Sequence, residues 1–314
     1  MCVLIPHVLP GAPMPRHHGR QVTIHMKNEV TAIFLLLVVH CKATQLTSSA
    51  QQAFEAYVAA VEARFARETK PYPGNPALTG RPEVVALNVQ PGGQNQWEGD
   101  LMHGEVRTEP VNGGTRQFDG ALLHHWRGAA FIPGARAKDM VALLRGRLPR
   151  NSTLEIVSSR VLADDGETAT LAVRFQKQVV IAIVIDAEYK VEAKLTGDGR
   201  GYGISRGTHF WQVDNPATDH ERRRKEGDDD GFLWRLNSYW GFVEAREGLE
   251  IGCEAVSLTR DVPRGLGWLI SPIVANLPRE LLESTMTTTM NTLAKKAPSA
   301  RAVTGGAEVR GGSR

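Results

Sequence analysis

One segment of the 314-residue chain alternates with a period of two, and it constrains the fold more than any other feature. Across residues 179–195, VVIAIVIDAEYKVEAKL, apolar side chains occupy every second position. Charged side chains fill the alternate positions from Asp186 to Lys194. Successive side chains of a strand point to opposite faces of its sheet. The segment therefore predicts a strand with one buried and one solvated face, which is typical of an antiparallel sheet.

Further segments extend this pattern into a run of strands. Strand-like composition occupies residues 83–90, 97–107, 119–132, 153–162, 168–178, 203–213, 231–243 and 249–260. Short turns rich in Asp, Glu and Gly at 165–167, 198–199 and 246–248 predict hairpins between neighbouring strands. The sequence therefore predicts an α+β protein built on one antiparallel sheet.

Three segments carry apolar residues at the three-to-four spacing of a helix, namely 51–68, 135–148 and 278–296. Pro278 suits the first turn of the last helix, and the lysines at 295 and 296 suit its negative C-terminal end. A half-buried sheet must cover its apolar face, so we expect this helix to lie on it. Residues 297–314 are rich in Gly, Ala and Ser, and we expect them to be disordered.

The first 43 residues have the pattern of an export leader. Residues 31–39 form an apolar run that is too short to span a bilayer, and Lys27 precedes it. Residues 41–43, Cys-Lys-Ala, provide a small-x-small cleavage site, and Met26 is the natural start of such a signal peptide. Residues 1–25 then represent an artefact of an upstream start codon. The leader predicts a periplasmic or secreted protein. If 31–39 is instead a buried strand or helix, the protein is cytoplasmic.

The formal net charge of +3 lies entirely within these 43 residues. They hold four basic residues against one acidic residue: Arg16, Arg20, Lys27 and Lys42 against Glu29. The remainder is formally neutral, which argues against nucleic acid as a partner. The chain has 3 cysteines, too few and too scattered for a disulfide framework or a zinc site: Cys2, Cys41 and Cys253. We expect no metal and no cofactor.

Two other motifs have simpler structural interpretations. Residues 203–207, Gly-Ile-Ser-Arg-Gly, match the G-x-S-x-G elbow of hydrolases, but a strand follows them and no histidine follows His220. A strand loosened by glycine is the better interpretation. Residues 219–230, DHERRRKEGDDD, mix acidic and basic side chains and predict a solvated loop. A docking patch and a metal-binding acidic end are the alternatives.

Two stretches of the chain resemble the START-like, helix-grip superfamily of lipid-transfer domains and polyketide cyclases. The first is residues 120–144, GALLHHWRGAAFIPGARAKDMVALL, a strand that runs into a helix. The second is residues 232–270, two strands followed by an Asp-x-Pro exit and the final helical region. The resemblance implies a curved antiparallel sheet gripping a long C-terminal helix over residues 119–296. Residues 44–118 then form an N-terminal helical and β extension.

The resemblance also implies an apolar pocket between the sheet and the C-terminal helix. We expect ten residues to bind the ligand: Ile183, Ile185, Tyr189, Phe210, Trp211, Trp234, Trp240, Leu282, Met286 and Met290. The candidate polar anchors are His124, Arg174 and Arg235. For each aromatic residue, the alternative is a filled core.

Three functions fit this pattern. The first is binding or transport of a hydrophobic small molecule or lipid, with transient membrane contact through the uncharged segment 265–277. The second is a cyclase-like enzyme on the same fold, for which the candidate polar residues are His124, Arg174, Tyr189 and Glu254. The third is a structural module without a ligand, whose partner docks on the loop 219–230. The oligomeric state stays open.

Overall fold

The computed structural model describes residues 45–69, 105–148, 156–178, 182–197, 199–245, 247–261 and 267–297, without the side chains of 267–275 and 277. Several sequence features lie outside these ranges. They are the leader at 1–43, the predicted strand at 83–90, most of the predicted strand at 97–107, and the tail from 298 to 314.

The described residues form one antiparallel sheet and three helices. Along the chain the elements are α2 (Ser48–Thr69), β1 (Arg107–Phe118), β2 (Ala121–Pro133), α4 (Ala137–Leu144), β3 (Ile156–Asp164), β4 (Thr168–Gln178), β5 (Ala182–Gly197), β6 (Arg200–Asp214), β7 (Arg222–Arg223), β8 (Arg235–Ala245), β9 (Gly248–Arg260) and α5 (Gly267–Lys296). The strand order across the sheet is β1-β2-β9-β8-β6-β5-β4-β3, and the short β7 pairs with β6.

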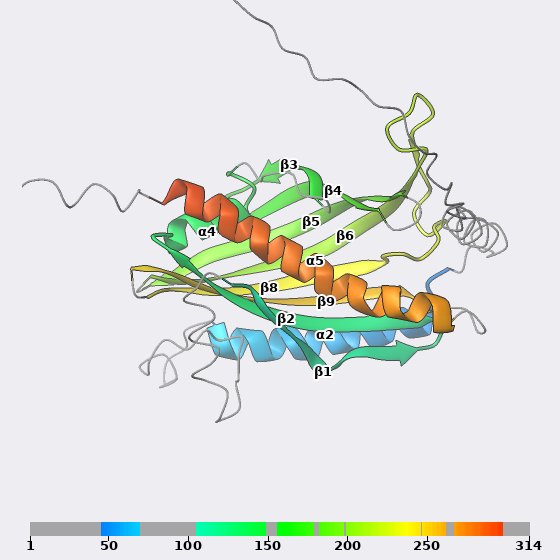
Figure 1. Cartoon of the computed structure of the whole chain (residues 1–314), viewed down its shortest axis with the longest axis horizontal. Coiled ribbons are helices and arrows are strands. Elements are labelled where there is room, and N and C mark those ends of the chain that lie inside the picture. The colour runs from blue at the N-terminus through cyan, green and yellow to red at the C-terminus, as the bar shows by residue number, and fades with distance from the viewer. Residues whose placement is uncertain are drawn as a thin grey trace, which may run out of the picture. The chain divides into compact units, whose positions relative to one another are not determined.

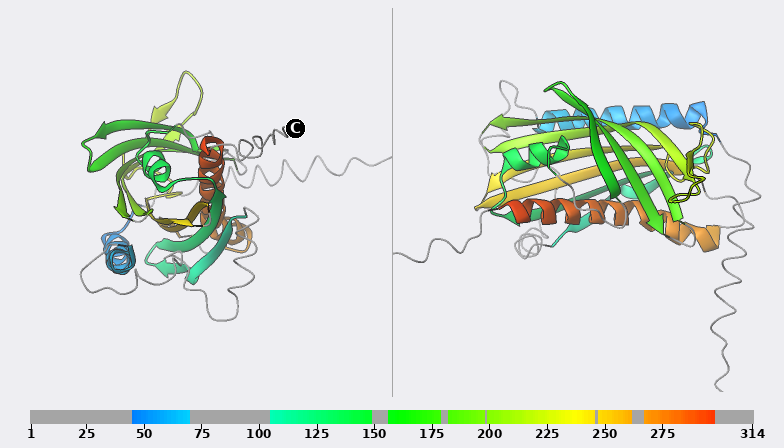
Figure 2. Two further views of the ribbon diagram at one scale, coloured as in Figure 1. Left: turned by 90° about the vertical axis from the view of Figure 1, so that its left-hand side faces the viewer. Right: turned by 90° about the horizontal axis from the view of Figure 1, so that it is seen from above.

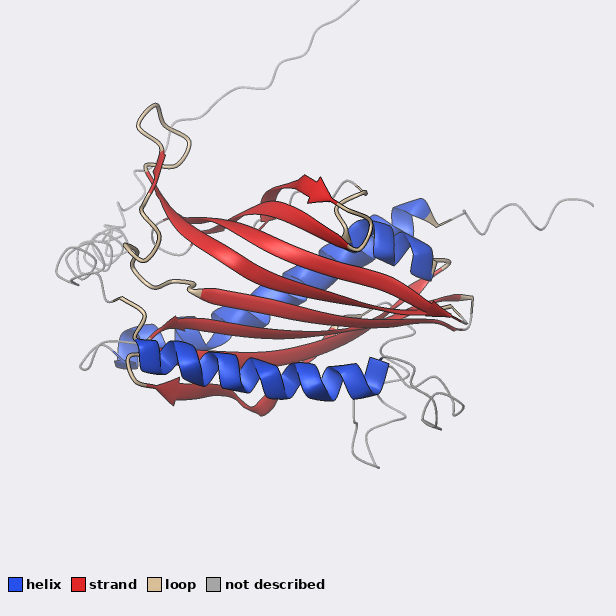
Figure 3. Ribbon diagram, turned by 180° about the vertical axis from the view of Figure 1, so that it is seen from behind, coloured by secondary structure: helices blue, strands red, loops and turns tan. Residues whose placement is uncertain are grey.

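The sheet curves, and a long helix lies on each of its faces. Figure 1 shows α5 crossing in front of the strands, and Figure 3 shows α2 on the opposite side. The view from above in Figure 2 has the sheet between the two helices. The face that carries α5 and α4 is called the concave face here, and the face under α2 the convex face. The predicted fold, a curved antiparallel sheet gripping a C-terminal helix with an N-terminal extension, is confirmed.

The period-two pattern in the sequence sets these faces. In β5, five residues belong to the core of the concave face: Ile185, Ala187, Tyr189, Val191 and Ala193. Asp186, between two of them, faces the other way and pairs with Arg174 of the neighbouring β4. The alternation that predicts a strand therefore also predicts which of its side chains reach the concave face.

The extension predicted for residues 44–118 is part of the same layered structure. Its helix α2 buries four apolar residues on the convex face: Ala50, Phe54, Val61 and Phe65. Strand β1 forms one edge of the sheet beside β2. Gly113 and Gly114, which predict a turn, lie within β1 at positive φ, where its pairing with β2 shifts register.

Helix α5 packs mainly on β2, to one side of the sheet. Gly128 of β2 permits this close approach, because a Cβ atom there would lie 2.5 Å from Sδ of Met286. Because α5 packs mainly on β2, it is less closely packed over β4 and β5, where cavities remain. Helix α4 packs over β5, β6 and β8 on the same face.

Two predicted boundaries are wrong, and each has a physical reason. The C-terminal helix begins at Gly267, so Pro278 lies within it rather than in its first turn. The apolar run before Pro278 continues the helix. The strand predicted for 231–243 begins at Arg235, because residues 231–234 form an irregular bend that starts at Gly231, whose φ is positive. The period-two pattern therefore does not extend back to Trp234.

Candidate functional site

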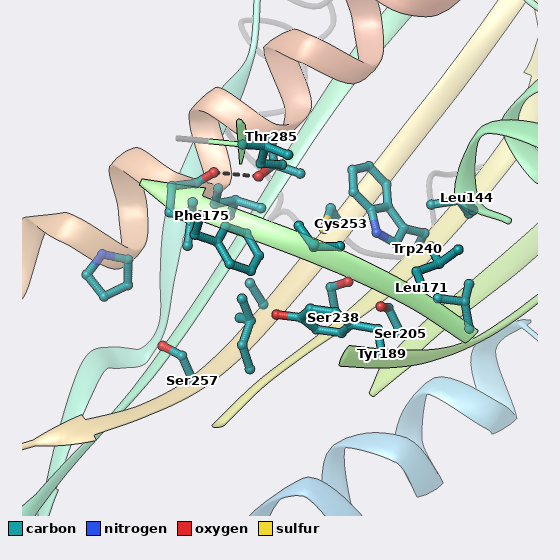
Figure 4. Close-up of a pocket in the computed structure, with 18 residues that line it drawn as sticks. Leu144, Leu171, Phe175, Tyr189, Ser205, Ser238, Trp240, Cys253, Ser257 and Thr285 are labelled. Atoms are coloured by element: carbon teal, nitrogen blue, oxygen red, sulfur yellow. Dashed lines mark hydrogen bonds between the residues drawn. The ribbon is translucent and has the colours of Figure 1, made fainter. Parts of the chain in front are cut away.

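A cavity of about 90 Å³ lies between α5 and the concave face of the sheet. Strands β3, β4, β5, β6, β8 and β9 and helices α4 and α5 contribute its walls (Figure 4). The lining residues are Leu144, Ile156, Leu171, Val173, Phe175, Tyr189, Val191, Ser205, Leu236, Ser238, Trp240, Cys253, Ala255, Ser257, Pro278, Leu281, Leu282 and Thr285. We call this space the first cavity.

A second cavity of about 80 Å³ adjoins the first. Four residues line both cavities: Phe175, Ser257, Pro278 and Leu281. The remaining walls of the second cavity are Gln176, Lys177, Ile183, Ile185, Phe232, Leu233 and Thr259. Lys177 forms an ion pair with Glu280 of α5 at 3.1 Å, so a charged contact ties the end of β4 to the helix.

The described lining of the first cavity contains hydroxyls and one thiol but no charged side chain. Ser205 and Ser238 are partners across β6 and β8. The Thr285 hydroxyl donates a hydrogen bond to the carbonyl of Leu281 at 2.7 Å (Figure 4). Burial raises the pKa of the Cys253 thiol, so this side chain stays neutral at physiological pH. The first cavity is therefore an apolar space with weak, uncharged hydrogen-bonding groups.

His124 lies near this region on the neighbouring strand β2 and is also uncharged. Its two ring nitrogens are hydrogen bonded to threonine hydroxyls, at 3.1 Å to Thr115 and 3.0 Å to Thr259. Burial lowers its pKa to about 4, because the imidazolium would lose its hydration. Thr259 also lines the second cavity, so His124 stands directly behind that wall.

Five of the ten predicted ligand-binding residues line the cavities. Tyr189, Trp240 and Leu282 line the first cavity. Ile183 and Ile185 line the second. Three more belong to the same core without lining either cavity: Phe210, Met286 and Met290. Phe210 packs edge-on against Tyr189, with ring centroids 5.9 Å apart, so it supports the cavity wall from behind.

Trp211 and Trp234, both predicted to bind the ligand, lie away from the cavities. A β-bulge where β6 pairs with Glu188 and Tyr189 shifts the alternation, so Phe210 faces inward and Trp211 outward. The Trp211 ring stacks on His209 and lies under the guanidinium of Arg223. Trp234 precedes β8 and packs in the core of the convex face.

Two of the three predicted polar anchors also lie outside the cavities. Arg174 pairs with Asp186 at 2.7 Å and with Glu221 at 2.9 Å on the convex face. Arg235 donates a hydrogen bond to the carbonyl of Trp234. The third, His124, is held by the two threonines. The expected pocket therefore exists, but its charged anchors do not reach it.

The four polar residues named for a cyclase do not converge. Tyr189 lines the first cavity and His124 lies behind the second. Glu254 lies on the convex face, paired with Arg64 of α2 at 2.5 Å, and Arg174 is paired as described. Adjacent strand positions explain this outcome, because Cys253 faces the first cavity and Glu254 must face the other way.

Several lining residues escaped the sequence analysis, above all Phe175, Leu171 and Val173 of β4. The same alternation marks them, because Arg174 and Ala172 separate them along the strand. Ser205, Ser238 and Ser257 also escaped it. Small polar residues on the inner face of a strand carry no sequence signal of a cavity until the neighbouring strands are known.

The remaining motifs have structural roles in the described chain. Ser205 of the G-x-S-x-G match lies within β6, which runs unbroken from Arg200 to Asp214, so the strand-to-helix turn of a hydrolase is not formed. The loop 219–230 is largely exposed and carries β7, whose Arg223 pairs with Asp186. No cluster suited to a metal ion occurs among the described residues.

Comparisons with known proteins concern the fold. No protein-family model matches the sequence, and no curated protein matches it. A STAR-related lipid transfer protein from Xanthomonas axonopodis is 16% identical, with a TM-score of 0.34 over 55% of this chain and 98% of that chain. Human StAR-related lipid transfer protein 5 is 10% identical, with a TM-score of 0.37 over 66% of this chain and 96% of that one.

A third solved structure is the di-domain ARO/CYC StfQ from the steffimycin biosynthetic pathway. It is 13% identical, with a TM-score of 0.34 over 55% of this chain and 52% of that chain. The strand order and the helix across the concave face give the curved antiparallel sheet and gripping C-terminal helix that the sequence resemblance implied.

Proposed function

We propose that this protein binds an uncharged, mainly apolar small molecule between α5 and the concave face of the sheet. The observation that carries the proposal is the composition of the first cavity, whose described walls are aliphatic, aromatic or hydroxyl-bearing, apart from the neutral thiol of Cys253. A lipid or a similar hydrophobic compound suits such walls. Transport of that ligand is the wider form of the same proposal.

Burial of apolar surface supplies the driving force. A ligand that buries about 200 Å² of apolar surface gains about 5 kcal/mol at ~25 cal/mol per Å², before the cost of association. The hydroxyls of Ser205 and Ser238 can orient one polar group of the ligand. A carboxylate or phosphate would lie in the first cavity without a countercharge among the described walls, and burying such a charge is costly. The ligand is therefore neutral where it meets this cavity.

The experiment is a binding titration with a neutral fluorescent probe, N-phenyl-1-naphthylamine. The wild-type chain should enhance the probe's fluorescence saturably. Ala255→Leu places a larger side chain in the wall of the first cavity and should weaken binding at least tenfold. Ala163→Leu adds the same atoms at an exposed position of β3 and should leave binding unchanged.

Mass spectrometry of small molecules extracted from the native protein would identify the ligand. An empty extract together with no probe binding would overturn the proposal and favour a structural module without a ligand. We do not propose a cyclase activity, because Arg174 and Glu254 are paired on the convex face.

Export and membrane contact are additional proposals. The apolar run at 31–39 and the cleavage site at Ala43 support export, and N-terminal sequencing of the protein from its native cells tests it. The uncharged segment 265–277 supports transient contact with a membrane, which vesicle co-sedimentation tests. None of the described helices combines the length and apolar character needed to cross a bilayer.

A further inference from the structure

The two cavities follow one another along the strands. On β4, Val173 lines only the first cavity, Phe175 lines both, and Lys177 lines only the second. On β9, Ala255 lines only the first cavity, Ser257 lines both, and Thr259 lines only the second. Both strands therefore pass from the first cavity to the second, so the cavities lie end to end along the strand direction.

Strand β5 runs antiparallel to β4 and gives the matching order in reverse. Its residues Tyr189 and Val191 line the first cavity, while Ile183 and Ile185 line the second. From Leu171 to Lys177 of β4, at a rise of ~3.3 Å per residue, the two cavities together extend about 20 Å. This is the length of an elongated molecule rather than of a single ring.

Each cavity alone is small. One buried water needs roughly 10–15 Å³ of such space, so about 90 Å³ corresponds to a handful of water positions. A single ring or a short aliphatic chain fits that volume. A larger ligand needs the first and second cavities to become one.

Phe175 is the residue that stands between them. Of the four shared wall residues, Pro278 and Leu281 belong to α5 and Ser257 to β9, so the ring of Phe175 comes from the facing side of the space. The ring is half-buried, and it meets Tyr189 edge-on with centroids 6.2 Å apart. Figure 4 shows Phe175 near the helix at one end of the first cavity, with Trp240, Leu171 and Leu144 at the other end. A side chain bordered by empty space on two sides can turn without displacing a packed core.

We propose that Phe175 sets the length of ligand that this protein accepts. In the observed position its ring divides the space, and when the ring turns aside the two cavities join to hold one elongated, uncharged apolar molecule along β4. This inference rests on the proposed function, because it concerns the same site. Lys177, at the far end, is paired with Glu280, so the joined space still presents no unpaired charge from that side chain.

The test uses a series of linear primary alcohols (hexanol, octanol, decanol and dodecanol) that displace N-phenyl-1-naphthylamine from the full chain. In the wild type, affinity should rise about fourfold per methylene for the short alcohols and then level off where the chain meets Phe175. In Phe175→Ala the rise should continue to dodecanol. Dodecanol should then bind the variant at least tenfold more tightly than the wild type, while hexanol changes less than threefold.

Phe175→Leu keeps an apolar side chain, so it tests the same change with less risk of a folding defect. It should also bind dodecanol more tightly than the wild type, by a smaller factor than Phe175→Ala. Phe232→Ala is the matched control, because Phe232 lines only the second cavity and its loss leaves the division in place. This control should keep the wild-type levelling. If the alcohols bind but all variants share one chain-length profile, the inference about Phe175 is overturned and the proposed function stands. If neither probe nor alcohol binds any variant, the proposed function fails as well.

Discussion

The two faces of one sheet hold their helices in opposite ways. Under α2 the convex face packs Phe54 and Phe65 into its core, with a set of charged contacts around them. Glu62 accepts two hydrogen bonds from Arg206, at 2.7 and 2.8 Å, and Arg64 pairs with Glu254. Under α5 the concave face keeps two cavities.

Two adjacent histidines of β2 show this difference between the charged convex face and the uncharged cavity region. His125 faces the convex side, where its ring nitrogens lie 2.8 Å from the Tyr57 hydroxyl and 3.4 Å from the Glu254 carboxylate. His124 faces the concave side between two neutral hydroxyls. The convex face fixes its helix by paired charges with defined geometry. On the concave face, the described walls of the first cavity carry no charged side chain, which suits this cavity to an apolar ligand.

The largest expected effect compares the same substitution on the two faces. Phe65→Ala should lower the free energy of unfolding by about 3–5 kcal/mol, because the ring is buried against Tyr239 and its removal leaves an unfilled cavity. Phe175→Ala should cost about 1–2 kcal/mol, since that ring already borders empty space. Urea denaturation of both variants measures the difference. Equal losses would mean that the concave face is as tightly packed as the convex one.

The next effect tests the charged contacts under α2. Glu254→Ala should lower the free energy of unfolding by about 3 kcal/mol, because it removes the buried carboxylate that faces both Arg64 and His125 and leaves Arg64 only its pair with Glu68. Glu254→Gln keeps the shape and one hydrogen-bond acceptor and should cost less. Urea denaturation gives both values, and probe binding by the folded variants should stay as in the wild type. Loss of binding in Glu254→Gln would show that the two faces are coupled.

Acid should lower the stability of the protein through His124, which is buried on the concave face. Its folded-state pKa of about 4 lies below the value of 6.5 for an unperturbed histidine. The unfolded chain therefore takes up a proton first as pH falls. Stability is fully present above about pH 6.5 and declines towards pH 4, by about 3 kcal/mol in total. His124→Asn should flatten this slope in urea denaturation at a series of pH values. An unchanged slope would place the titrating group elsewhere.

The smallest expected effect concerns the aromatic residue that faces away from the cavities. Trp211→Phe should change the affinity for N-phenyl-1-naphthylamine by less than twofold, because Trp211 contacts His209 and Arg223 instead. Trp240→Phe, in the wall of the first cavity, should change it severalfold. The reverse ranking would contradict the assignment of the faces.

Sequence reasoning predicts the sheet, its antiparallel order and the helix across it, because period two is a local property that survives in the folded strand. It fails where one extra residue changes the phase. The bulge in β6 turns Phe210 towards the concave face and Trp211 away from it, and no residue type in that segment predicts the bulge. The stripe of α2 predicts that Phe54 and Phe65 are buried, but the face they cover depends on contacts with strands far along the chain. The cavities share this origin, since Phe175 becomes a dividing residue only beside α5.

The pairing of β2 with β9 has a consequence for how the protein is made. Ala121 pairs with Arg260 and Pro133 with Gly248, so β2 must wait for a partner that is synthesised much later. Strands β3 to β6 form a meander of near neighbours and can assemble first. Contacts between distant segments slow folding, and here they also complete the floor beneath α5. A ligand of the cavities therefore binds only the folded protein, and its binding should raise the melting temperature by mass action.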